Sequence, residues 1–205
     1  MDPLQLGLLA IVGIAAGFLN VMAGGGSLLT VPIMLFMDIP APIANGTNRI
    51  AILAQNITAV ITFFRRGFSE FKLSFSLTLI SLPGAIAGAL LGTQLEGEWF
   101  NRLVAVIMIA VMIIMALENK GQGKTSPSGL SAEEPSRKQL IWGHALMVGA
   151  GFWGGFIQLG VGFLIMPILH RVMGLNLLRT NMHKVFIIGV HTCAALIIFA
   201  SQVEI

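Results

Sequence analysis

Charged residues are scarce in this chain. They make up 10% of its 205 residues, whereas apolar residues make up 56%, and a soluble domain carries about a quarter of charged residues. No charged residue intervenes between Asp2 and Asp38 or between Lys72 and Glu96, and a helix needs roughly 20 apolar residues to cross the hydrocarbon core. The composition therefore excludes an ordinary soluble fold and predicts an all-α integral membrane protein.

Cysteine is nearly absent as well. Cys193 is the single one and lies within an apolar stretch, which excludes an intrachain disulfide and a cysteine-based metal cluster. His144, His183 and His191 form no ligand pair at helical i, i+3 or i, i+4 spacing, so we expect neither a metal site nor another cofactor. His183, beside Lys184, is a candidate for proton coupling, with simple helix packing as the alternative.

The N-terminus lacks a basic flank, so we expect no cleaved signal peptide. Lysine and arginine together number 12 against 9 acidic residues, but they are spread over the loops rather than gathered in one stripe, which argues against nucleic acid as a partner. If every segment crosses once, residues 65–72 and 118–138 share one side, and their basic excess predicts that this side is cytoplasmic. Arg171 and Arg179 then fall on the opposite side.

Hydrophobicity predicts about six segments, at about 4–37, 42–64, 73–95, 99–117, 140–170 and 175–200. The first and fifth are too long for one straight span and contain glycine clusters and prolines, so we expect helices broken at mid-membrane or re-entrant hairpins. The hydrophilic stretch 119–138 is predicted to be a cytoplasmic loop. It separates a first membrane repeat, 1–118, from a second and incomplete one, 139–205.

The two halves share one pattern. Residues 17–34 read GFLNVMAGGGSLLTVPIM, residues 151–169 read GFWGGFIQLGVGFLIMPIL, and each copy is followed by a cation, Arg49 or Lys184. A shift of 135 residues places Ser27 on Gly162 and Arg49 on Lys184. This pattern indicates an internal repeat, but the sequence leaves open whether the repeats are parallel or inverted.

The glycine clusters suit the binding of an anion. Glycine lets a ligand approach the main chain, and a helix that restarts at Ser27 presents unpaired N–H groups at its positive end. We expect Ser27 to cap this start and to donate its hydroxyl to the anion. Close packing is the alternative for these glycines, and we assign it to five others: Gly13, Gly17, Gly84, Gly88 and Gly92.

Two cations lie deep within apolar segments. Ionisable residues at such depth predict a function, so we expect Arg49 and Lys184 to bind the anion. For Arg49, extension to the membrane surface is the alternative. Asn48 and Asn181 precede them and offer neutral donors or helix caps. The predicted substrate-binding residues are Gly24, Gly25, Gly26, Ser27, Asn48, Arg49, Gln158, Gly160, Gly162, Asn181 and Lys184.

The motifs GFLNVMAGGGSLLTVP, ANGTNRIAIL and ITFFRRG, with GFWGGFIQLGVGFLIMP and RTNMHKVFI in the second half, resemble the sulfite exporter TauE/SafE family of bacterial and archaeal transporters. The resemblance implies a multi-pass protein of the inner membrane, in contact with lipid, that exports a small sulfur-containing anion such as sulfite or an organosulfonate. Members usually continue with two further helices. A homo-oligomer is compatible with this resemblance.

Alternating access around the two broken segments is the expected mechanism. A passive anion channel or a non-transporting scaffold subunit is the alternative. A membrane-embedded hydrolase that uses Ser27 with His144 or His191 is disfavoured because GGGSLL lacks the second glycine of a GxSxG elbow. The chain also has no Walker motif for ATP, so we expect no enzymatic activity.

Overall fold

The computed structural model describes residues 3–68, 70–94, 102–103, 105–106, 109 and 135–202. Within these ranges the chain is helical and has no strand. Among them, three helices are long and apolar enough to cross a membrane, α1 (Pro3–Ala23), α4 (Phe71–Gly92) and α8 (Leu177–Gln202). The prediction of an all-α membrane protein is confirmed, whereas most of the predicted segment 99–117 and of the loop 119–138 lies outside the described residues.

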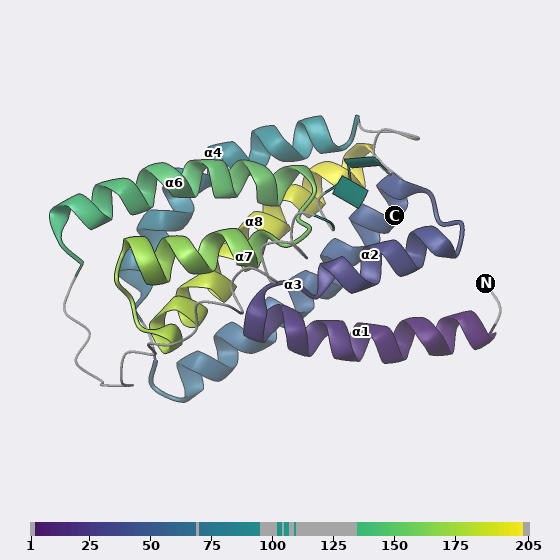
Figure 1. Ribbon diagram of the computed structural model, residues 1–205, viewed down its shortest axis with the longest axis horizontal. Coiled ribbons are helices and arrows are strands. Elements are labelled where there is room, and N and C mark those ends of the chain that lie inside the picture. The colour runs from purple at the N-terminus through teal and green to yellow at the C-terminus, as the bar shows by residue number, and fades with distance from the viewer. Residues whose placement is uncertain are drawn as a thin grey trace.

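Both long apolar segments are broken into two helices. The first consists of α1 and α2 (Ser27–Phe36), and the fifth of α6 (Arg137–Phe156) and α7 (Val161–Pro167), which continues as the π-helix η1 (Ile168–Val172). At each break the chain turns back, so that the two helices form a hairpin (Figure 1). The predicted break in each of these two segments is therefore present, and each break forms the turn of a hairpin.

Each hairpin turns at a residue with left-handed backbone. Gly24 follows α1 with a φ of 84°, and its N–H donates to the carbonyl of Leu19, which is the usual way for glycine to end a helix. Gln158 follows α6 with a φ of 64°, and its N–H donates in the same manner to Trp153. The second half thus places a glutamine where the first half has a glycine.

The two hairpins point in opposite directions. The pair α1 and α2 extends from one end of the molecule and the pair α6 and α7 from the other, and their tips meet between the ends (Figure 1). Helix α3 (Ala41–Arg65) follows the first hairpin and α8 follows the second. These two helices run antiparallel and pack together. These directions make α1–α2–α3 and α6–α7–α8 an inverted pair.

Helices α4 and α6 pack through small residues. A side chain on Gly84, Gly88 or Gly92 would collide with the backbone of α6, and one on Gly155 of α6 would collide with the backbone of α4. Small residues of this kind let membrane helices approach closely. The packing prediction is confirmed for these three α4 glycines, but it is wrong for Gly13, which has no described atom within 4 Å of the position of a Cβ.

The buried apolar core lies where α3, α4, α6, α7 and α8 meet, and it includes Ile52, Leu77, Met147, Ile165 and Ile187. Helix α1 is different, because most of its large apolar side chains are exposed. An apolar helix of membrane-spanning length with an exposed surface fits contact with lipid tails.

Most of the described basic residues lie at one end of the helical bundle. The carboxylate of Glu70, in the loop before α4, lies 2.5 Å from the Nη2 atom of Arg179 on α8. The expectation that Arg171 and Arg179 lie opposite residues 65–72 is therefore wrong, because α7 turns back instead of completing a crossing. Described cations on the helix termini at this end (Figure 1) are Arg65, Arg66, Lys72, Arg137, Lys138, Arg171 and Arg179.

Candidate functional site

The tips of the two hairpins are in direct contact. A methyl group on Gly24 would overlap the Cα of Gly162, and a methyl group on Gly162 would overlap the Cα of Gly24. A Cβ on Gly25 would collide with the ring of Phe163, which follows Gly162 in α7. Glycine is required here because any side chain would separate the two backbones. The structure therefore brings together the two glycine clusters that the sequence predicts to form one site.

Ser27 connects the two tips rather than capping its own helix. Gly26 is the N-cap residue of α2, and Ser27 is the first residue of the helix. The Oγ atom of Ser27 accepts a hydrogen bond of 3.3 Å from the backbone N–H of Gly160. The capping prediction for Ser27 is thus wrong, because the start of α2 has no side-chain cap and the Ser27 hydroxyl accepts from the opposite break. Gly26 itself packs closely against the backbone of Ala16 in α1.

Lys184 binds the end of α1. Its Nζ donates hydrogen bonds to the carbonyl oxygens of Val21, at 2.7 Å, and Asn20, at 3.5 Å, and the residue is 0% exposed. The last carbonyls of a helix have no partner within the helix and carry the negative end of its dipole. A buried cation from another helix supplies both a hydrogen-bond donor for these carbonyls and a positive charge opposite the dipole. Lys184 therefore does not extend to the membrane surface.

Arg49 binds the end of α6 in the corresponding way. Its Nη2 donates to the carbonyl of Gly155 at 2.6 Å and of Phe156 at 3.4 Å, and its Nη1 donates to Gly154 at 3.2 Å. The guanidinium also lies 4.3 Å from the centre of the Phe199 ring, within the range of a cation–π contact. Arg49 is 0% exposed, which excludes the surface position for this residue too.

Each of the two cations binds the half of the molecule to which it does not belong. Arg49 of the first half binds the broken helix of the second half, and Lys184 of the second half binds that of the first. Their role as anion ligands stays a prediction. Among the described residues the buried Nε of Arg49 has no hydrogen-bond partner, so one N–H of this guanidinium is left for a ligand.

The remaining predicted polar residues are Asn48, Gln158 and Asn181. Asn48 precedes Arg49, and its Oδ1 accepts a hydrogen bond of 2.6 Å from Thr30 of α2. The Nε2 of Gln158 donates to Thr192 of α8. The Oε1 of Gln158 and the Oδ1 of Asn181 are buried and have no partner within the part of the chain that the structure describes. Unpaired buried acceptors of this kind mark positions where water or a ligand donor is expected.

A row of serine–histidine pairs is the feature that the sequence analysis missed. Helix α4 contributes three serines, and each lies within hydrogen-bonding distance of a histidine: Ser74 and His183 Nδ1 at 2.7 Å, Ser76 and His144 Nε2 at 2.9 Å, and Ser81 and His191 Nε2 at 2.8 Å. The spacing of the hydroxyls of Ser74, Thr78 and Ser81, at i, i+4 and i+7, is a helical-face signal that an apolar helix rarely carries.

These pairs also bear on the hydrolase alternative. His144 and His191 each pair with a serine of α4, whereas Ser27 accepts from Gly160. The proposed nucleophile therefore pairs with neither proposed base. The described residues contain no cluster of three or more potential metal ligands.

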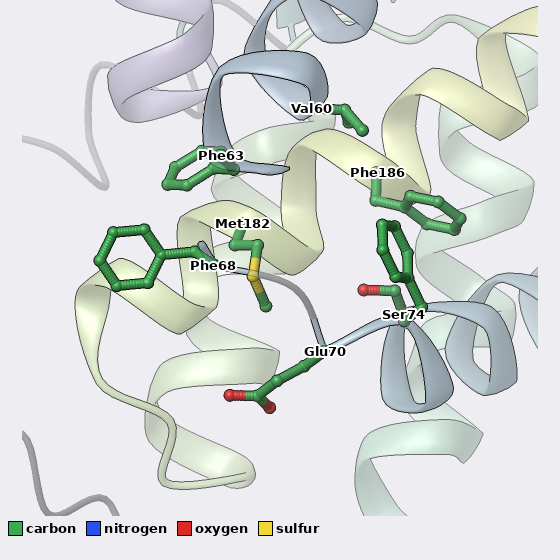
Figure 2. Close-up of a pocket in the computed structure, with 8 residues that line it drawn as sticks. Val60, Phe63, Phe68, Glu70, Ser74, Met182 and Phe186 are labelled. Carbon is green, nitrogen blue, oxygen red and sulfur yellow. The ribbon is translucent and has the colours of Figure 1, made fainter. Parts of the chain in front are cut away.

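A small pocket lies at the basic end of the bundle (Figure 2). Its volume of about 10 Å³ is room for a single water molecule. The lining residues come from α3, the following loop, α4 and α8, and they are Val60, Phe63, Phe68, Glu70, Phe71, Ser74, Met182 and Phe186. The carboxylate of Glu70 and the hydroxyl of Ser74 are the polar groups in an otherwise apolar wall (Figure 2).

Comparison with known proteins gives consistent results. Residues 9–205 match the family model described as sulfite exporter TauE/SafE. The chain is 29% identical to the probable membrane transporter protein ORF9 of Sinorhizobium sp, over 91% of this chain and 70% of that protein. It is 27% identical to the probable membrane transporter protein YfcA of Escherichia coli K12, over 97% of this chain and 71% of that protein. No solved structure matches the chain.

Proposed function

Because the chain belongs to the sulfite exporter TauE/SafE family, we propose that it exports a small sulfur-containing oxyanion, such as sulfite or an organosulfonate, across the cell membrane. The chain is a multi-pass membrane protein, and its relatives are named as probable membrane transporters. The family description supports the sulfur anion, whereas the geometry supports an anion in general.

The observation that carries this proposal is the meeting of the two hairpin tips at Gly24 and Gly162. Substrate sites of transporters with inverted repeats lie where broken helices meet, since the breaks free backbone polar groups at mid-membrane. Near the breaks the chain offers the hydroxyl of Ser27, the side-chain amide of Gln158 and the Nε of Arg49, which has no hydrogen-bond partner among the described residues. Each of these is a hydrogen-bond donor to an oxyanion.

We infer alternating access as the mechanism. The tips touch, so a substrate enters only when the hairpins separate. Each hairpin is tied by a cation to the long helix of the opposite half, Arg49 on α3 and Lys184 on α8. A rocking motion of one half against the other would open the contact toward one side and then the other. The basic end of the bundle would face the cytoplasm.

The test uses purified protein in liposomes. With labelled sulfite inside, external unlabelled sulfite should accelerate the loss of label, and the rate should saturate with concentration. Saturable counterflow supports a carrier. Flux that rises linearly with concentration would indicate a channel, and absence of flux would indicate a scaffold subunit. Phosphate and sulfoacetate, assayed in parallel as competitors, measure whether the site selects sulfur anions.

A further inference from the structure

His183 lies in a buried polar cluster at the basic end of the bundle. Its Nδ1 is 2.7 Å from the Oγ of Ser74 on α4. Its Nε2 is 3.6 Å from the Oε2 of Glu70, and the same oxygen is 2.5 Å from the Nη2 of Arg179. The cluster therefore joins α4, the loop before it and α8.

The second ring nitrogen of His183 has no hydrogen-bond partner within the described residues, although it is completely buried. When Nδ1–H donates to Ser74, Nε2 carries a lone pair and faces the carboxylate of Glu70. A proton that binds to Nε2 turns this nitrogen into a donor toward Glu70. The resulting imidazolium forms an ion pair with Glu70 across 3.6 Å, which offsets part of the cost of a buried charge.

A proton has a path to this nitrogen. The side chain of Glu70 is 40% exposed and lines the pocket together with Ser74 (Figure 2). A carboxylate that contacts water on one side and a buried imidazole on the other is the arrangement by which proton relays in membrane proteins operate.

Of the described cations at this end of the bundle, Arg179 is the one whose charge acts on His183. On α8 itself Arg179 opposes a charge on the imidazole, and Lys184 turns its Nζ to the carbonyl of Val21. Helix α3 contributes the apolar Val60 and Phe63 to the pocket.

The histidine of α6 and helix α1 add no further charge to this cluster. Both ring nitrogens of His144 are occupied, by Ser76 and by the carbonyl of Leu140. Helix α1 has no ionisable side chain over Pro3–Ala23. Glu70 is thus the acidic partner of His183 among the described groups.

We propose that His183, held by Ser74 and facing Glu70, binds the proton that drives the transport cycle. This inference rests on the proposed transport function. Conformations in which Glu70 contacts α8 favour a proton on His183. Conformations in which the loop that carries Glu70 moves away favour loss of this proton. Because Lys184 follows His183 in the chain and binds the end of α1, a shift of this turn of α8 acts on the hairpin tip as well.

The test measures transport with and without a pH gradient across the liposome membrane, together with a pH-sensitive dye inside. A permanently ionised sulfonate is used beside sulfite, because sulfite itself takes up a proton near neutral pH. The wild type should show gradient-driven accumulation and proton movement that depends on substrate. His183→Asn should lose both while it retains counterflow, which needs no net proton transfer. Glu70→Gln should weaken the response to the gradient.

His144→Gln is the matched control, since His144 also pairs with a serine of α4 but has no unpaired nitrogen. It should keep the gradient response. Accumulation by His183→Asn at the level of the wild type would overturn the proposal, and so would an equal loss in both variants.

A second measurement separates this proposal from the transport function. If the wild type moves neither anion, the substrate proposal fails, and the proton site is then judged by NMR of labelled imidazole nitrogens in detergent, with His183→Asn to assign the signal. Protonation of His183 between about pH 5 and pH 8, the range in which histidine serves as a switch, supports the site. A signal that stays constant over this range overturns it.

Discussion

The Nζ atom of Lys184 lies 2.7 Å from the carbonyl oxygen of Val21, although 163 residues separate the two in the chain. Arg49 and Gly155 form the reciprocal contact at 2.6 Å, across 106 residues. Each half of the molecule thus completes the broken helix of the other half. Since the cation at each helix end comes from the opposite half, each half depends on the other to satisfy these carbonyls.

Removal of the Lys184 cap should destabilise the protein. Lys184→Met leaves the carbonyls of Asn20 and Val21 without a donor, so we expect the free energy of unfolding to fall by about 1–3 kcal/mol. Chemical unfolding in detergent, followed by circular dichroism, measures the change. Lys72→Met is the control, because Lys72 is exposed at the start of α4 and its loss should change stability little. Equal stability of the two variants would contradict the capping role.

Neither Arg49→Gln nor Arg49→Lys should retain the stability of the wild type. The guanidinium reaches three carbonyls through a planar fork, and an ammonium is a point charge that cannot reproduce this geometry. We expect Arg49→Lys to be intermediate in stability between the wild type and Arg49→Gln, with a total loss of about 2–3 kcal/mol in the latter. Sulfite affinity, measured well below each variant's unfolding temperature, tests the separate role as an anion ligand. Unchanged affinity in Arg49→Gln would remove Arg49 from the substrate site.

Substitution by alanine should lower the stability at Gly162 but not at Gly149. A Cβ on Gly162 meets the backbone of Gly24, whereas a Cβ on Gly149 of α6 meets no described atom within 4 Å. Gly162→Ala should lower stability by about 1–3 kcal/mol and reduce the rate of counterflow, because it forces the tips apart. Gly149→Ala should be neutral or more stable by up to about 1 kcal/mol. The prediction fails if Gly162→Ala retains both stability and transport.

Gln158 is expected to matter for transport more than for stability. It is one of two described residues other than glycine with positive φ, and glycine would relieve that strain of about 1–2 kcal/mol. The same change removes the hydrogen bond to Thr192, worth about 0.5–1.5 kcal/mol. We therefore expect Gln158→Gly to change stability by less than about 1 kcal/mol and to reduce sulfite affinity. A fully active variant would exclude the amide from substrate binding.

Local sequence features predicted much of this fold. Glycine clusters and prolines inside overlong apolar runs are local properties, so the breaks after α1 and α6 were predictable without knowledge of their neighbours. The glycine row of α4 was predictable for the same reason, because small residues at a spacing of four form one helical face. Ser27 and Gly13 were exceptions among the short-range predictions. A residue 133 positions away supplies the N–H that Ser27 accepts, and no described atom lies within 4 Å of the position of a Cβ on Gly13.

The amino-acid sequence by itself determined that this chain resides in a membrane, that its first and fifth segments are interrupted and that a cation follows each interruption. Only the tertiary structure decided that the repeats are inverted, that Arg49 and Lys184 bind the helix ends of opposite halves and that Ser74 faces His183. The physical reason is the separation along the chain over which each kind of interaction acts. Hydropathy and backbone preference act within a few residues, whereas a buried donor takes the acceptor that folding brings beside it, here more than 100 residues away.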